Sequence, residues 1–295
     1  MGERPATDSR RYIVAFELRS KADCPPDFEL PPSLTAFDTG LFLPRDDPDW
    51  FGRSSYPPRI VLLNDGGLHI FSHPSAGEPP RQFAMEQIAS VESGHMLLKG
   101  WLRFTGPDFD FTIRYNTRGF LPVFRFMRRF RDKLLHGAQP GGTPEVRFGG
   151  DLDNKFANAL EQELDPGEVV LMRIFQPPRE VRSRSWLLPR RQWIAGDLLA
   201  LTARRLLWIT DRERKSYSRY GTIASYAPCD ALLSIGLTTA RRKDILHVGL
   251  NTGSSWQVPM ASEGRWDCRR LAEDFAAALE IQKRSNEAAR TEVGR

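Results

Sequence analysis

Apolar and polar positions near the middle of each half of the chain alternate in blocks that are typical of β-hairpins. In the first half, apolar residues 60–63 and 68–71 flank the turn Asn64-Asp65-Gly66-Gly67. The Asp-Gly and Gly-Gly steps allow the positive φ that a tight hairpin turn requires. In the second half, the run Asp197 to Asp211 has the same form. The pattern therefore predicts one β-hairpin in each half.

Other strand-like segments surround these hairpins. Between 109 and 115, Phe109, Phe111, Ile113 and Tyr115 alternate strictly with other residues, which predicts a half-buried sheet. Weaker patterns predict a first strand at 12–16, strands at 83–91 and 97–104 in the first half, and strands at 168–175, 193–202, 206–210, 231–235, 245–250 and 255–258 in the second.

Three segments have the three- and four-residue spacing of an amphipathic helix. In residues 120–135, one face is apolar and basic residues occupy the remainder. Its apolar residues are Val123, Phe126, Met127, Phe130 and Leu134. Residues 152–164 predict a short helix, and residues 268–281 predict another with Leu271, Phe275 and Leu279 inward. Each half thus ends on one helix.

The two halves keep their elements at a nearly constant distance along the chain, as copies of one unit do. Residues 68–71 match 206–209 at an offset of 138, and 88–91 match 232–235 at 144. The segments 111–113 and 256–258, and the two closing helices, match at 145. We interpret the chain as a duplicated β-rich unit that is closed by a helix.

A chain of 295 residues accommodates two such domains without metal or disulfide support. We expect a first domain over 1–136, whose proline-rich extension between Pro25 and Pro58 is irregular and wraps the domain. A glycine- and proline-rich linker follows over 137–150. The second domain spans 151–282, and the charged residues 283–295 form a flexible tail.

Composition narrows the functional classes. Hydrophobic content of 40% and charged content of 27% describe a globular protein. No apolar run is long enough to span a bilayer and the amino terminus lacks a signal core, so we expect a cytoplasmic protein. Cys24, Cys229 and Cys268 are far apart in sequence, which predicts reduced structural thiols and neither a cofactor nor a metal site.

The second half resembles the bacterial members of the pleckstrin-homology-like superfamily. The resemblance is carried by Asp165-Pro-Gly-Glu-Val-Val-Leu171 and by the hairpin Leu201-Thr-Ala-Arg-Arg-Leu206 with its continuation to Asp211. It covers 151–282 directly and 55–136 through the repeat, where Gly66-Gly67 replaces the arginine pair. The resemblance implies tandem β-barrels that are each capped by a carboxyl-terminal helix. We expect Arg204 and Arg205 to lie at the turn in contact with water.

Two basic segments are candidates for ligand binding. The first segment, residues 179–193, contains Arg182, Arg184, Trp186, Arg190 and Arg191. It is the first inter-strand loop of the second domain, and the resemblance implies that this loop binds lipid headgroups. The second basic patch consists of Arg212, Arg214, Lys215 and Arg219. The alternative is that residues 186–188 pack against the protein beside solvated arginines.

The histidines are scattered and join no carboxylate cluster, and no phosphate-binding glycine loop or nucleophile elbow occurs. We therefore expect a non-enzymatic binding or scaffolding protein whose partner is a protein or peptide. The alternative is a peripheral membrane protein that binds anionic lipid headgroups through residues 179–193. We do not expect a nucleic-acid partner, because no nucleic-acid motif accompanies the basic charge.

Overall fold

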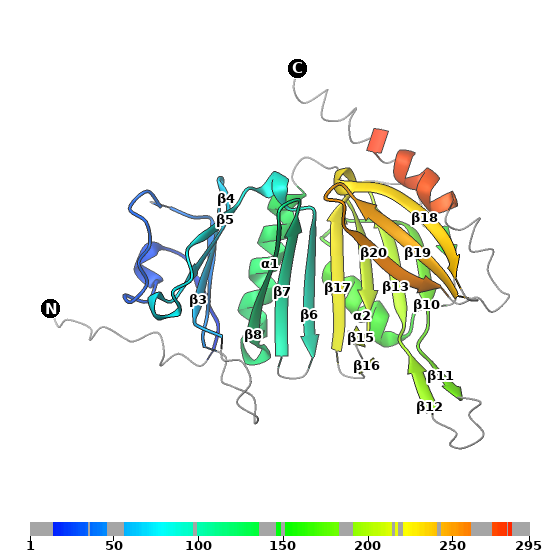
Figure 1. Ribbon diagram of the computed structural model, residues 1–295, viewed down its shortest axis with the longest axis horizontal. Helices are drawn as coiled ribbons and strands as arrows, with labels where there is room; N and C mark the ends of the chain where they lie inside the picture. Colours follow the sequence, from blue (N-terminus) through cyan, green and yellow to red (C-terminus); the bar gives the residue numbers. More distant parts are fainter. Residues whose placement is uncertain are drawn as a thin grey trace. The chain divides into compact units, whose positions relative to one another are not determined.

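The computed structural model shows a mainly β protein, as the sequence predicts (Figure 1). It describes residues 14–34, 36–45, 56–96, 99–135, 146–148, 151–182, 191–213, 216–217, 221–240, 243–260, 273–281 and 283–284. The chain divides into two compact units. The N-terminal unit comprises Met1–Ile88, His95–Arg103 and Phe111–Leu134; the C-terminal unit comprises Ala89–Gly94, Phe104–Asp110 and Leu135–Arg295.

A five-stranded antiparallel sheet organises the N-terminal unit, in the order β1-β2-β3-β4-β5. Its strands are β1 (Phe16–Leu18), β2 (Thr39–Leu43), β3 (Arg59–Asn64), β4 (Gly67–Ser72) and β5 (Arg81–Phe83). The predicted hairpin between β3 and β4 is confirmed, because Leu63 opposes Leu68 and Asn64 opposes Gly67. The Asp65-Gly66 step forms the turn, and Gly67 has a φ of 118°.

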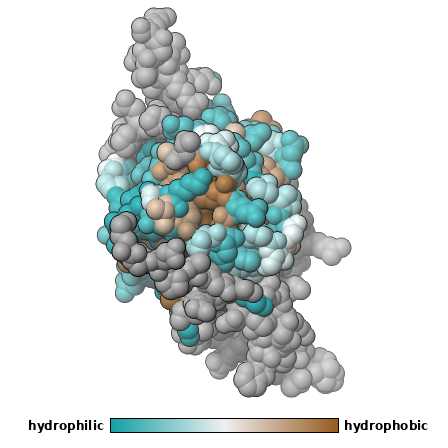
Figure 2. All heavy atoms as spheres, turned by 90° about the vertical axis from the view of Figure 1, so that its left-hand side faces the viewer, coloured by the Kyte–Doolittle hydropathy of each residue, from teal (hydrophilic) through white to brown (hydrophobic). Residues whose placement is uncertain are grey.

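Both faces of this sheet are buried. Helix α1 (Phe120–Leu134) contacts β1 and β2, and it buries the predicted residues Val123, Phe126, Met127 and Phe130. Phe28 and Leu34 of the proline-rich segment pack with Phe42, Ile60 and Leu62. Figure 1 shows β3 between this segment and α1. Figure 2, which views the left-hand side of Figure 1, shows apolar side chains near the middle of the face, surrounded by polar ones.

Strand β2 was not predicted from the sequence, which instead suggested irregular chain from Pro25 to Pro58. All five residues of β2 are buried. A strand that is buried on both faces shows no alternation of apolar and polar residues, so the two-residue period is absent from its sequence.

Three more strands follow β5 and are divided between the two units: β6 (Ser90–Met96), β7 (Lys99–Gly106) and β8 (Phe109–Asn116), with β7 between the other two. The predicted single strand over 83–91 is wrong. The chain leaves β5 at Phe83, makes the 3-10 turn η4 (Met85–Gln87) and starts β6 at Ser90. The other 3-10 turns are η2 (Lys21–Asp23), η3 (Pro74–Ala76), η5 (Thr117–Gly119) and η6 (Cys229–Ala231).

The C-terminal unit contains a four-stranded antiparallel run and a separate three-stranded sheet. The run is β10 (Val170–Gln176), β13 (Asp197–Thr202), β14 (Arg205–Thr210) and β17 (Gly221–Pro228), and β9 (Val146–Phe148) lies parallel to β10. The second sheet is β18 (Leu232–Ala240), β19 (Lys243–Leu250) and β20 (Ser255–Met260). Two small hairpins, β11 (Arg179–Arg182) with β12 (Arg191–Ile194) and β15 (Arg212–Glu213) with β16 (Ser216–Tyr217), complete the strands.

These two sheets of the C-terminal unit share one hydrophobic core. Leu199 and Leu206 of the first sheet pack with Leu246 and Val258 of the second. A helix over 273–281 adds Phe275 and Leu279 to this core, which confirms that the two residues face inward. Leu271, the third predicted inward residue, lies outside the described residues.

Helix α2 (Asn154–Glu163) covers another face of this unit and confirms the predicted short helix. Asp153 caps its N-terminus by accepting a hydrogen bond from the Phe156 amide at 2.9 Å. The ring of Phe156 lies 5.2 Å from that of Phe175 in β10. Thus, the segment before β2 in one unit and the segment before β10 in the other each cover a sheet face, as irregular chain in the first and as a helix in the second.

The predicted closed barrels are not what the described strands form. In the C-terminal unit, the chain turns through η6 between β17 and β18, so the two sheets stay separate and open. Strand β17 was missed from the sequence, since all eight of its residues are buried and many are small. Of the predicted linker 137–150, only residues 146–148 are described, as β9; of the predicted tail 283–295, residues 285–295 lie outside the described residues.

Candidate functional site

Each of the two basic segments contains a short β-hairpin at one end of the four-stranded antiparallel run in the C-terminal unit. Gln176, the last residue of β10, opposes Asp197, the first residue of β13, and Asp197 opposes Thr210, the last residue of β14. The β11–β12 hairpin links the first pair of strands, and the β15–β16 hairpin follows β14. Because Gln176, Asp197 and Thr210 stand in register, both hairpins leave the sheet at the same end.

Three of the predicted site residues lie on strands of these hairpins. Arg182 opposes Arg191 directly, and Arg212 opposes Tyr217. The remaining predicted residues, Arg184, Trp186, Arg190, Arg214, Lys215 and Arg219, lie outside the described residues. Whether Trp186 packs against the protein stays a prediction.

A second candidate surface is the edge of the three-stranded sheet. Strand β18 pairs with β19 and, in the described part of the chain, with no other strand. Its Leu233 side chain is 66% exposed. Ile281, in the helix over 273–281, is 70% exposed. Backbone groups along such an edge are available to an added strand.

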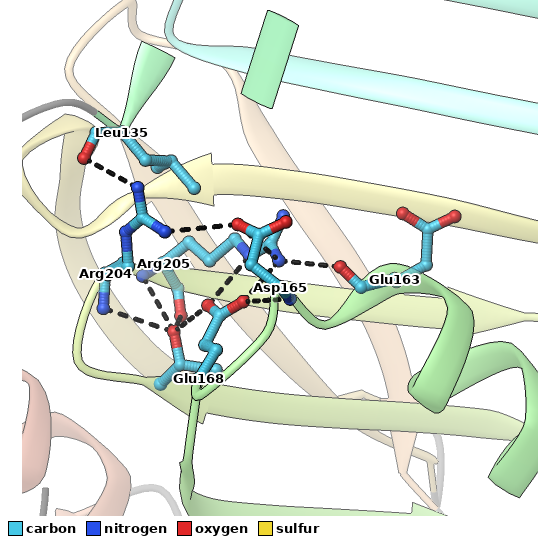
Figure 3. A network of polar contacts seen from close by, with 7 residues as sticks. Leu135, Glu163, Asp165, Glu168, Arg204 and Arg205 are labelled. Atoms are coloured by element: carbon cyan, nitrogen blue, oxygen red, sulfur yellow. Dashed lines mark hydrogen bonds and ion pairs between the residues drawn. The ribbon is translucent and has the colours of Figure 1, made fainter. Parts of the chain in front are cut away.

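The expectation for Arg204 and Arg205 is wrong. Arg205 is fully buried, and its guanidinium holds the Glu168 carboxylate through Nε at 3.0 Å and Nη2 at 2.5 Å (Figure 3). Arg204 donates to Asp165 at 3.2 Å and to the Leu135 carbonyl at 3.1 Å. The turn between β13 and β14 is therefore bound to residues 165–168, which lie in the segment before β10.

Thr202 completes this cluster from the end of β13. Its hydroxyl donates to Glu168 Oε1 at 2.7 Å and accepts the amides of Arg204 and Arg205 at 3.1 Å each. Arg205 Nη2 also donates to the Glu163 carbonyl at the end of α2, at 2.6 Å. We call these residues, Asp165, Glu168, Thr202, Arg204 and Arg205, the buried corner.

Electrostatics keep the Glu168 and Arg205 pair of the buried corner ionised. Burial alone would raise the pKa of Glu168. The positive charge of Arg205 and the hydrogen bonds from Arg205, the Asp165 amide and the Thr202 hydroxyl outweigh burial and lower this pKa. Burial alone would lower the pKa of Arg205, and the Glu168 carboxylate reverses that change. Two cations and two anions balance in a desolvated site, which suits a structural clamp better than a ligand site.

One histidine has the partners that a catalytic base would need. His73 Nε2 lies 3.1 Å from Asp27 Oδ2, and His73 Nδ1 lies 2.7 Å from Ser75 Oγ. Nδ1 also accepts the Ser75 amide at 3.2 Å and so caps the 3-10 turn η3. His73 thereby fixes the proline-rich segment, through Asp27, to the end of β4. This local cap explains the contacts without catalysis.

No protein-family model matches the chain, and no curated protein is similar to it in sequence. Among the described residues, no group of three His, Cys, Asp or Glu side chains is placed to hold a metal ion. The described helices are too short or too polar to cross a membrane.

Proposed function

We propose that the protein is a non-enzymatic binding or scaffolding protein of two pleckstrin-homology-like units, whose C-terminal unit binds an extended peptide along β18. In the C-terminal unit, the four strands of the antiparallel run come first, the three strands of the second sheet come next, and a helix closes the unit. The small hairpins β11–β12 and β15–β16 lie between strands of the run. The sequence β2 to β5, β6 to β8 and α1 repeats that order. This repeated order supports the superfamily resemblance despite the open sheets.

The observation that carries the proposal is the one-sided pairing of β18. About every second residue of this nine-residue strand directs its backbone N–H and C=O groups away from β19, and an extended peptide satisfies such groups by adding a strand. The exposed Leu233 side chain supplies an apolar contact beside this edge. A peptide with alternating apolar side chains has the chemistry to match both features.

The test is peptide selection on the full chain, followed by affinity measurements on a Leu233→Asp variant. Leu233 is exposed, so this substitution should leave the fold intact while it places an uncompensated charge in the interface. We expect at least about a tenfold loss of affinity, or roughly 1.4 kcal/mol. Leu121→Asp, at an exposed leucine of the N-terminal unit, is the matched control. Equal affinity in both variants would exclude β18 as the binding edge.

The shared origin of the two basic hairpins favours a second candidate function, peripheral binding to an anionic membrane. Arginines near one end of a sheet attract lipid headgroups, and the attraction weakens with salt. Co-sedimentation with phosphatidylserine vesicles tests this function. A triple substitution, Arg182→Ala with Arg191→Ala and Arg212→Ala, should abolish the binding, and Trp186→Ala should weaken it. Absence of sedimentation at low salt excludes this function.

A further inference from the structure

Strand β8 is a long edge strand whose exposed face carries one charge of each sign. It pairs with β7 and, in the described part of the chain, with no other strand (Figure 1). Ile113 and Tyr115 are buried on one face of its eight residues, and Asp110 and Arg114 are exposed on the other. Thr112 lies midway between the two charged residues and on the same face. The edge of β8 therefore combines backbone groups that can accept another strand with a charged face beside them.

The other edge strands of the described larger sheets are less suited to pairing with a second copy of the chain. Strands β1, β5 and β9 have three residues each, and β20 contains Pro259, which has no backbone N–H to donate. Short edges and proline are common devices against pairing between copies. Strand β18 is long, but it contains no charged residue that could fix the register of a second β18. Strand β8 has both the length and the charges.

The order of the charges in β8 favours pairing with a second β8. Charges on an edge strand usually oppose such pairing, because like charges then meet across the two strands. When two antiparallel copies of β8 are centred on Thr112, however, Asp110 of each copy stands opposite Arg114 of the other, since both residues lie two positions from the centre. The twofold symmetry forms both ion pairs at once. A shift of the register would separate them.

The Arg114 guanidinium is already held in place by an aromatic ring. Its Cζ atom lies 5.0 Å from the centre of the Tyr56 ring. This contact uses the face of the guanidinium, whereas hydrogen bonds to a carboxylate use the N–H groups in its plane. A side chain that is ordered before association loses less entropy when it forms an ion pair. Asp110 also interacts within its own chain, and its two carboxylate oxygens can accept from more than one donor.

We propose that the protein forms a homodimer in which β8 of one copy pairs antiparallel with β8 of a second copy, centred on Thr112. This pairing does not rest on the proposed peptide site, because β18 belongs to another sheet. A dimer carries two β18 edges, so it would bind a partner with repeated peptide segments more tightly than a single copy does.

Sedimentation equilibrium of the full chain tests the dimer. One copy has a mass of 33.6 kDa, and we expect the average mass to approach twice this value as the protein concentration rises. One strand pair makes a small interface, so the series should extend from about 1 μM to about 0.5 mM.

Reversal of either charge should weaken the dimer. Asp110→Arg places arginines opposite each other, and Arg114→Asp places carboxylates opposite each other. Because symmetry repeats each like-charged pair, we expect the dissociation constant to rise at least about tenfold in each variant. An equimolar mixture of the two variants should dimerise as the parent does, because each copy supplies the charges that the other lacks. Such recovery would exclude misfolding as the cause of the loss.

Two control variants keep the test specific to β8. Glu29→Arg, at an exposed glutamate of the proline-rich segment, makes the same change of charge outside β8 and should dimerise as the parent does. Leu233→Asp should also leave the dimer unchanged, whereas it would disrupt a dimer that formed through β18. A parent protein that stays monomeric over the whole series overturns the proposal. Dimers that persist in both charge-reversal variants, or a mixture that does not recover, overturn it as well.

Discussion

The β3–β4 and β13–β14 turns share one construction and stabilise their units by different means. Asn64 accepts the amide of Gly66, and Thr202 accepts the amide of Arg204, in each case two residues later and at an offset of 138. In the C-terminal unit, Arg205 then pairs with Glu168 inside the protein. In the N-terminal unit, Lys133 of α1 joins Asp65 of the turn to Asp38 before β2, at 2.8 Å and 2.5 Å.

The buried corner and the group of Asp38, Asp65 and Lys133 differ in their exposure to water. Glu168 and Arg205 have no exposed side-chain surface, whereas Asp65 is fully exposed and Asp38 is 56% exposed. Water screens the second set of charges and not the first. Each group of charges joins a hairpin turn to the segment before another strand, which is β2 in the N-terminal unit and β10 in the C-terminal unit. Only the buried one should therefore contribute strongly to the free energy of unfolding.

The largest expected effect is that of Glu168→Gln. The substitution leaves Arg205 buried beside a neutral amide, and an uncompensated buried charge costs about 3–5 kcal/mol. Urea unfolding of the purified chain measures the loss. The control removes both charges, as Glu168→Leu with Arg205→Met, and should cost less than the single change because the remaining charges, Asp165 and Arg204, balance each other. A single-variant loss below about 1 kcal/mol would show that Arg205 is not held by Glu168.

Gly67→Ala should give the next largest loss, about 2–3 kcal/mol. Gly67 has a φ of 118°, and a Cβ there would meet the Phe83 carbonyl oxygen at 2.1 Å, which is backbone and cannot turn away. Gly77 is the matched control, since its φ of 63° is also positive but a Cβ meets nothing within 4 Å. Gly77→Ala should cost about 1 kcal/mol. Thermal unfolding compares the two, and equal losses would show that contact with β5 is unimportant.

A smaller effect should appear in the pH dependence. Because the folded pKa of Glu168 lies below the ordinary value of 4.5, its stabilisation is fully present above that pH and is lost as pH falls through the folded pKa. The difference in unfolding free energy between the parent protein and Glu168→Gln should therefore shrink below pH 4.5. Urea unfolding from pH 7 downward measures it. A constant difference would mean that folding does not change the pKa of Glu168.

The sequence predicts hairpins and helices better than it predicts these corners. Asn64-Asp65-Gly66-Gly67 specifies its turn locally, and the spacing from Val123 to Phe130 specifies the buried face of α1. The burial of Arg205 depends on Glu168, which is 37 residues away in sequence, so local reasoning placed this arginine in water. The available signal was the Asp165 to Glu168 phrase, which supplies two carboxylates with no nearby cation.

Buried strands were missed for a related reason. The period of a strand reports which face meets water, and neither β2 nor β17 has such a face. The proposed peptide edge and the proposed pairing of β8 depend on which strands lie at the edge of a sheet, which no single segment encodes.

The smallest expected effect, and the sharpest check on the comparison, is that of Lys133→Met. The methionine keeps the length of the side chain and removes its charge, so Asp38 and Asp65 lose a cation while both remain in water. Exposed ion pairs contribute about 0–1 kcal/mol, and screening reduces that further in high salt. Urea unfolding at low and at high ionic strength should show a small loss that disappears with salt. If Lys133→Met instead costs as much as Glu168→Gln, solvation does not distinguish the two corners, and the exposed bridge is as important to its unit as the buried corner is to the other.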